Sequence, residues 1–318
     1  MSVVTLSAIG ATARLTALQA AWTQWSAVTH TASQADDREA TAVVDPEALL
    51  LLSLTLWEDE RRLRDLCFAF AVQDAKLLSV HRAQELCSAF PDSTHALLTE
   101  FASWAKHPSW FRLAKLAVSR ETPAPRQKPL GPLRLHNPPA LYLRFRTAFG
   151  VGLKSDLLTC AVCRQERSST VSQLATFVAY SERNTRAAAD DLVEAGLLVR
   201  DDYSPQQTYR AAPGDWAAFL SFGADESLNV TRVPRWQPWS VLFAFLAQVA
   251  DTARRSETHA WSDYVCSSRA RDIVELHYPT LIRAEVAEWS GVMPGKGEPL
   301  AELDRLVAAT RNIVVHGL

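Results

Sequence analysis

The stretch from Thr170 to Arg210 places the strongest constraint on the fold of this chain, because its capping, apolar and turn residues follow one another in a fixed order. Ser172 can cap a short helix that continues through Phe177, and a turn is expected over residues 178–180. Ser181 then offers a second hydroxyl cap to the exposed amides of the next helix. The order predicts two short helices that are separated by one turn.

The second of these helices is expected to be amphipathic. Small and apolar residues fall on one face at three- and four-residue spacing: Thr185, Ala188, Ala189, Leu192 and Val193. The opposite face is polar and carries Glu182, Arg183, Arg186 and Asp190. Gly196 supplies a left-handed helix stop, and residues 197–199 begin a strand that turns near Ser204 and Pro205 and returns through residues 207–209. A β-hairpin is therefore predicted directly after the helix.

This segment resembles the winged-helix domains of bacterial transcriptional regulators, broadly the MarR-like and ArsR-like group. The resemblance rests on the pattern S-x-x-x-T-x-x-x-x-x-x-L-V-E-A-G-L-L between Ser181 and Leu198, and it covers about one quarter of the chain. It implies that the second helix enters the major groove of DNA with Arg183, Asn184 and Arg186 toward the bases. Arginine and asparagine are suited to the edges of guanine and adenine.

The wing and the overall charge depart from what a strong phosphate-binding surface needs. Asp201 and Asp202 stand where the family often has basic residues, and residues 151–212 hold seven Lys/Arg against eight Asp/Glu. The basic flank between Arg120 and Arg146 is expected to supply the missing attraction to phosphate. Its basic residues are Arg120, Arg126, Lys128, Arg134, Arg144 and Arg146, with Glu121 as the one acid. The residues expected to contact or position the DNA backbone are Ser172, Ser181, Arg144 and Arg146.

The whole chain is expected to be mostly α-helical, with the winged helix-turn-helix and its small hairpin wing between two helical domains. Its 318 residues are 48% hydrophobic and carry a formal charge of −2, which suits two or three packed units and argues against a general nucleic-acid coat. Six prolines in residues 121–139 indicate a linker. The predicted organisation is a helical domain at 1–120, a basic linker at 121–139, the winged domain at 140–212 and a second helical domain at 213–318.

The cysteines and the apolar runs predict a cytoplasmic protein without a metal. Five cysteines are too scattered for a disulfide scaffold, and the sequence has no secretory signal pattern and no apolar run long enough to span a membrane. Cys160 and Cys163 have the spacing of metal ligands, but they lie in an apolar helix without a second ligand pair. We expect two buried thiols there, no metal and no cofactor.

Two further patterns leave alternatives open. Arg311, Asn312 and His316 resemble the R-N-x-x-x-H signature of HEPN nucleases, which implies an arginine and a histidine that act on an RNA hydroxyl and phosphate. The competing interpretation is an amphipathic terminal helix with Arg311 in solvent. Trp236, Pro238 and Trp239 either fill a core or line a ligand pocket between the winged unit and the C-terminal helices.

The sequence thus predicts a DNA-binding transcriptional regulator that acts as a homodimer on duplex DNA and is not an enzyme. The two subunits are expected to contact half-sites about one helical turn apart. A small-molecule effector is left open, and RNA cleavage through Arg311 and His316 is the alternative function.

Overall fold

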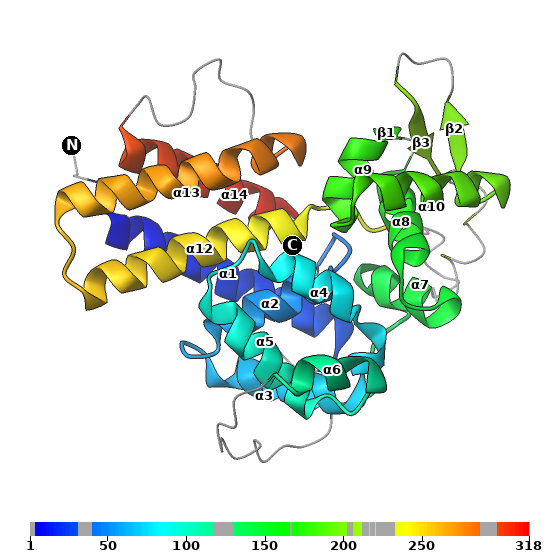
Figure 1. Cartoon of the computed structure of the whole chain (residues 1–318), viewed down its shortest axis with the longest axis horizontal. Helices are drawn as coiled ribbons and strands as arrows, with labels where there is room; N and C mark the ends of the chain where they lie inside the picture. The colour runs from blue at the N-terminus through cyan, green and yellow to red at the C-terminus, as the bar shows by residue number, and fades with distance from the viewer. Residues whose placement is uncertain are drawn as a thin grey trace, which may run out of the picture.

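The computed structural model describes residues 4–30, 40–116, 130–165, 167–201, 206–211, 216, 220, 233–286 and 298–317. This part of the chain is mostly helical and contains one small antiparallel sheet (Figure 1). The expectation of a mostly α-helical protein is therefore confirmed. Its elements gather around two hydrophobic cores.

The N-terminal region is a set of packed helices with short 3₁₀ turns between them. They are α1 (Leu6–Val28), α2 (Pro46–Leu56), α3 (Arg61–Gln73), α4 (Val80–Cys87), α5 (Ser93–Trp104) and α6 (Phe111–Ala114), with η1 (Ala75–Leu77) and η2 (Pro108–Trp110). Asp45 caps α2 and is followed by Pro46, which suits the first turn of a helix. α5 ends at Trp104, four residues before Pro108, because a proline ring there does not fit the interior of a helix.

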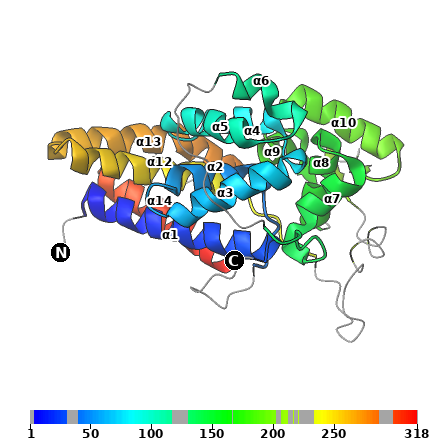
Figure 2. The ribbon, with the colours of Figure 1, turned by 90° about the horizontal axis from the view of Figure 1, so that it is seen from below.

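The four longest described helices come from both ends of the chain and lie side by side (Figures 1 and 2). They are α1, α12 (Trp239–Thr258), α13 (Asp263–Arg283) and α14 (Pro299–Gly317). Together with α2–α5 they share one core. The sequence interpretation placed residues 1–120 and 213–318 in two separate domains; in the structure their helices pack into a single body.

A middle unit with its own core holds the remaining elements (Figure 1, green). They are η3 (Pro138–Ala140), α7 (Leu141–Phe149), α8 (Leu153–Cys163), β1 (Ser169–Thr170), α9 (Val171–Val178), α10 (Glu182–Glu194), β2 (Val199–Asp201) and β3 (Thr208–Arg210). The strands pair antiparallel in the order β1-β3-β2, with Arg200 opposite Tyr209 and Thr170 opposite Thr208. The first strand, β1, adds a third strand to the predicted hairpin.

The two short helices form where the sequence predicts them, with one change of cap. Thr170, two residues before the expected Ser172, caps α9 in a capping box with Gln173. Ala179 adopts the left-handed conformation that ends α9. Ser181 then caps α10 through the amide of Asn184, at 3.4 Å, as predicted.

The second helix buries the predicted face. Thr185, Ala188, Ala189 and Leu192 are buried, and Val193 is half-buried. Gly196 has a φ of +73°, which fits its predicted role as the stop after the helix. The hairpin turn predicted at 204–205 lies outside the described residues.

Candidate nucleic-acid interface

The outer face of α10 presents the three residues that the sequence assigned to base contacts. Arg183, Asn184 and Arg186 are all exposed, while the opposite face of the helix packs on α8 and α9. The middle unit places α10 on the side of the molecule away from α13 and α14 (Figures 1 and 2). The small side chains on the buried face allow α10 to pack closely, so its polar face stays in solvent.

Hydrogen bonds and an ion pair connect the hairpin of β2 and β3 to α10. Arg186 Nη1 donates to Gln207 Oε1 at 2.9 Å, just before β3. The hydroxyl of Tyr209 donates to Asp190 Oδ1 at 2.8 Å, and Arg200 pairs with the same carboxylate oxygen at 3.4 Å. Burial and the contact with Asp190 raise the pKa of Tyr209 to about 12, so the hydroxyl stays a donor. These contacts set the position of β2 and β3 relative to the helix.

The same contacts change the charge that the helix presents. Asp190 is turned to the hairpin, and Asp191 pairs with Lys154 of α8 at 2.9 Å. Arg183 has no carboxylate within ion-pair distance among the residues that the structure describes. Two of the acids that weigh against phosphate binding are therefore neutralised by neighbours.

Arg146, expected to position the DNA backbone, is buried and does not reach the surface. Its guanidinium donates to Asp156 at 2.9 and 3.0 Å and to both carboxylate oxygens of Glu47, the longer of those contacts being 3.0 Å. It also donates to the carbonyl of Leu77 at 2.9 Å. With 2% of its surface exposed, Arg146 cannot contact phosphate, and this assignment is wrong.

The other residues expected to contact the DNA backbone are less buried than Arg146. Ser172 is half-buried in the first turn of α9, and Arg144 is half-buried on α7, where burial lowers the pKa of its guanidinium. Arg134 donates to the carbonyl of Ser26 at 3.2 Å and so helps to hold its own segment against α1. The remaining basic residues of the flank, Arg120, Arg126 and Lys128, lie outside the described residues.

The pair Cys160 and Cys163 is buried in α8, as expected for core thiols. Burial raises the pKa of Cys160 to about 12 and the pKa of Cys163 well above its usual value, so both stay protonated. No group of three or more His, Cys, Asp or Glu side chains in the described part of the chain is arranged to hold a metal.

The nuclease-like pattern lies in the last helix. Arg311 and Asn312 are exposed on α14, and position 316 also belongs to this helix, although its side chain lies outside what the structure describes.

The tryptophan cluster divides between core and surface. Trp239 is buried, stacks on Phe243 and donates to the carbonyl of Val43 at 2.7 Å. Trp236 and Pro238 instead line a cleft of about 380 Å³ between α8, α9 and the end of α13. Trp239 therefore fills a core, whereas Trp236 and Pro238 line a cleft, and a ligand for that cleft stays a prediction.

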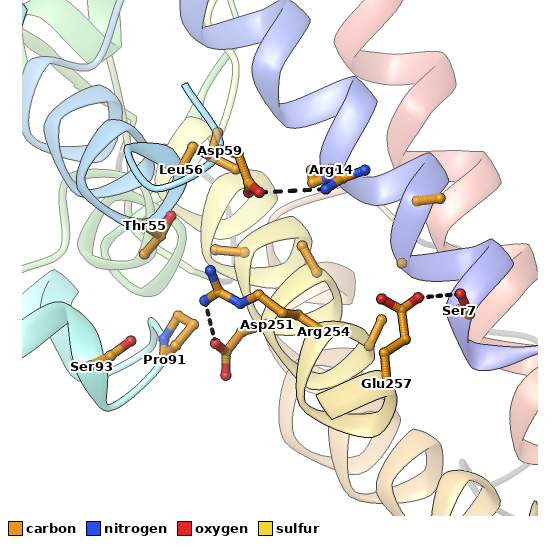
Figure 3. Close-up of a pocket in the computed structure, with 15 residues that line it drawn as sticks. Ser7, Arg14, Thr55, Leu56, Asp59, Pro91, Ser93, Asp251, Arg254 and Glu257 are labelled. Atoms are coloured by element: carbon orange, nitrogen blue, oxygen red, sulfur yellow. Dashed lines mark hydrogen bonds and ion pairs between the residues drawn. The ribbon is translucent and has the colours of Figure 1, made fainter. Parts of the chain in front are cut away.

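A smaller pocket of about 90 Å³ lies between α1, α12 and the end of α2 (Figure 3). Its charged side chains are paired with one another: Arg14 with Asp59 at 3.4 Å, and Arg254 with Asp251 at 2.8 Å. The hydroxyl of Ser7 donates to Glu257. Such a pocket has little unsatisfied charge to attract a ligand.

Comparison with family models, curated proteins and solved structures finds no match to this chain. Within the described residues, each helix is too short or too polar to cross a bilayer.

Proposed function

We propose that this chain binds duplex DNA through α10 and regulates transcription, as a winged helix-turn-helix protein. The observation that carries the proposal is the exposure of Arg183, Asn184 and Arg186 on one face of a helix whose other face is buried. The order of elements from α8 to β3 supports it, because a helix, a strand, two further helices and a hairpin follow one another as in that fold.

The proposed contact places the first turns of α10 in the major groove. Arginine forms bidentate hydrogen bonds with guanine, and asparagine with adenine, so Arg183 and Asn184 supply direct contacts to base edges. Arg186 is held by Gln207, and this orientation lowers the entropy lost when the side chain meets DNA. The free amides at the start of α10 and the hydroxyl of Ser181 favour a nearby phosphate.

Because Arg146 is buried, it is left out of the residues proposed to contact the DNA backbone. Ser172, Ser181 and the half-buried Arg144 remain the proposed positioning residues. With few basic residues around the helix, non-specific binding is weak, and base contacts carry most of the affinity. We further propose a homodimer that binds two half-sites about one helical turn apart.

The test is binding of the full chain to preferred duplexes that are selected from a random pool. The single variants Arg183→Ala and Arg186→Ala are each expected to weaken binding to the selected site by about 1–3 kcal/mol in a mobility-shift titration. Arg112→Ala, an exposed arginine on α6, is the matched control and leaves the affinity unchanged. Equal affinity of the double variant Arg183→Ala/Arg186→Ala and the unchanged chain would remove α10 from the proposal.

The same preparation tests the RNA-cleaving alternative. If the chain degrades RNA and His316→Ala abolishes the degradation, the catalytic function replaces the regulatory one. The regulator proposal predicts no RNA degradation, and it predicts DNA binding that weakens as the salt concentration rises.

A further inference from the structure

The cleft beside Trp236 has the size of a small-molecule site and is partly open to solvent. Its volume of about 380 Å³ lies within the range of about 300–1,000 Å³ that is usual for ligand pockets. The last turn of α8 and the side of α9 form one wall, the segment 235–238 forms another, and the end of α13 also lines it. Figure 1 shows the end of α13 approaching α9 at this place.

The charge of the cleft is positive. Three arginines line it, Arg164, Arg167 and Arg235, against one carboxylate, Glu285. Arg164 Nη2 pairs with Glu285 at a long 3.4 Å. Arg167 and Arg235 are exposed, and neither has an acidic partner within ion-pair distance in the described part of the chain. An anion in the cleft would therefore meet at least two guanidinium groups that are not engaged by carboxylates.

The inner wall adds aromatic surface and unpaired donors. The rings of Phe177 and Trp236 lie 6.2 Å apart, and the guanidinium of Arg164 lies 4.6 Å from the centre of the Phe177 ring. The side chain of Arg164 is only 9% exposed, and its Nε has no hydrogen-bond acceptor in the described structure; the same holds for Trp236 Nε1. A buried donor without an acceptor is unfavourable, so the polar atoms of this wall are not all satisfied within the described residues.

Glu285 shows how an anion is held at this place. It follows the end of α13 in the left-handed conformation, with a φ of +63°, and its carboxylate also accepts from Gln173 Nε2 at 3.3 Å. The side chain is 47% exposed. The Glu285 carboxylate thus links the end of α13 to Arg164, just after α8, and to Gln173 on α9. Both contacts are long, so a bound anion with shorter contacts to these arginines can take the place of this carboxylate.

We propose that this cleft binds a small organic anion with an aromatic body, whose acidic group meets Arg167 and Arg235 and whose ring packs on Phe177 and Trp236. The site does not depend on DNA binding, and it lies next to the first helix of the proposed DNA-binding unit. Neither a neutral aromatic compound nor an inorganic anion supplies both kinds of contact.

The test measures binding to the full chain by isothermal titration calorimetry, with 2-naphthoate as the probe. The neutral analogue 2-naphthamide has the ring without the charge, and inorganic phosphate has the charge without the ring. We expect 2-naphthoate to bind with one site per chain and at least tenfold more tightly than either comparison compound. The double variant Arg167→Ala/Arg235→Ala is expected to lose at least tenfold in affinity, and Arg112→Ala, on α6, to lose none.

The side chains of Arg167 and Arg235 are exposed, so their removal leaves the core intact, and circular dichroism checks that the variant is folded. Trp236→Phe keeps an aromatic ring and is expected to retain binding, whereas Trp236→Ala weakens it. The proposal is overturned if 2-naphthoate does not bind. It is also overturned if either comparison compound binds as tightly, or if the double arginine variant binds as well as the unchanged chain.

Discussion

Five charged side chains form a buried cluster, in which each charge needs an oppositely charged partner because it is removed from water. Arg146 lies between Glu47 and Asp156, and Arg82 pairs with Glu47 at 2.7 Å and with Asp45 at 2.6 Å. Arg82 Nε also donates to the carbonyl of Val178 at the end of α9, at 2.8 Å. The cluster therefore ties α2 and α4, in the large core, to the helices of the middle unit.

The pKa values in the cluster reflect three carboxylates that share two guanidinium groups. Burial would raise the pKa of Asp45, but the charge and hydrogen bonds of Arg82 outweigh it and lower that pKa. For Asp156, burial dominates and raises the pKa in spite of Arg146. Of these two carboxylates, Asp156 on α8 is thus the one whose burial is less fully offset by the nearby guanidinium groups.

Removal of Arg146 should be strongly destabilising, because it leaves buried carboxylates without their partner. We expect Arg146→Met to lower the free energy of unfolding by about 3–5 kcal/mol in a denaturant titration. The exposed Arg112→Ala should change it by less than about 0.5 kcal/mol. If Arg146→Met unfolds at the same denaturant concentration as the unchanged chain, the cluster does not hold the two cores together.

His277 on α13 should make stability depend on pH. It is buried against Phe245, and burial lowers the pKa of its imidazole from 6.5 to about 4. Because this pKa lies below that of the unfolded chain, the stabilising contribution is fully present above about pH 6.5 and is lost as the pH falls toward 4. The loss amounts to about 3 kcal/mol at the end of that range.

The measurement is the free energy of unfolding between pH 7 and pH 4 for the unchanged chain and for His277→Leu. The variant should show a flatter profile over this range, because leucine takes up no proton on unfolding. Parallel profiles for the two chains would count against a buried neutral His277. His259, exposed at the end of α12, provides a control variant, His259→Leu.

At the scale of elements, the pairing of α1 with α12 depends on one glycine. A Cβ atom on Gly10 would lie 2.0 Å from the Cβ of Ala253, so the two helices could not keep their present distance. A glycine-to-alanine change in an unobstructed helix would stabilise it by up to about 1 kcal/mol. Here the close contact with Ala253 makes the change in stability unfavourable, because closely packed helices must shift apart to make room for an added methyl group.

We therefore expect Gly10→Ala to lower the free energy of unfolding by about 1–3 kcal/mol, measured by thermal or denaturant unfolding. Leu15→Ala, at a position 65% exposed on the same helix, is the control and should have little effect. A rise in stability for Gly10→Ala would mean that α1 and α12 are not packed as closely as the structure shows.

Local sequence signals determined the elements of the middle unit well. The cap at Ser181, the stop at Gly196 and the buried face of α10 all depend on residues within a few positions of one another. Thr170 could have been found as the cap of α9, because Gln173 three residues later completes a capping box. Short-range patterns of this kind also suggested a DNA-binding surface, which stays a prediction.

At the scale of the whole molecule, the two ends of the chain complete one core. α1 packs against both α12 and α14, and the middle unit is inserted between these segments along the chain. The helices at both ends therefore bury their apolar faces against one another. Segment 42–44 is held from both sides, since Val43 receives a hydrogen bond from Trp239 and Val44 donates to the carbonyl of Pro139.

A chain without residues 238–318 should fail to fold in its N-terminal region, because α1 would expose the apolar face that α12 and α14 cover. We expect it to lose more helical signal in circular dichroism than the deleted helices account for. The unchanged chain is the reference. A truncated chain that loses only the helical signal of the deleted helices would show instead that the N-terminal helices fold without them.

The sequence by itself determined the short helices, their caps and the hairpin after them, because each depends on hydrogen bonds and spacing within a few residues. Only the tertiary structure decided what Arg146 and Trp236 do. One of the two carboxylate partners of Arg146, Glu47, lies 99 positions away, and the end of α13 lines the cleft beside Trp236. Whether a charged or aromatic side chain reaches water depends on what covers it, and the covering elements come from distant parts of the chain.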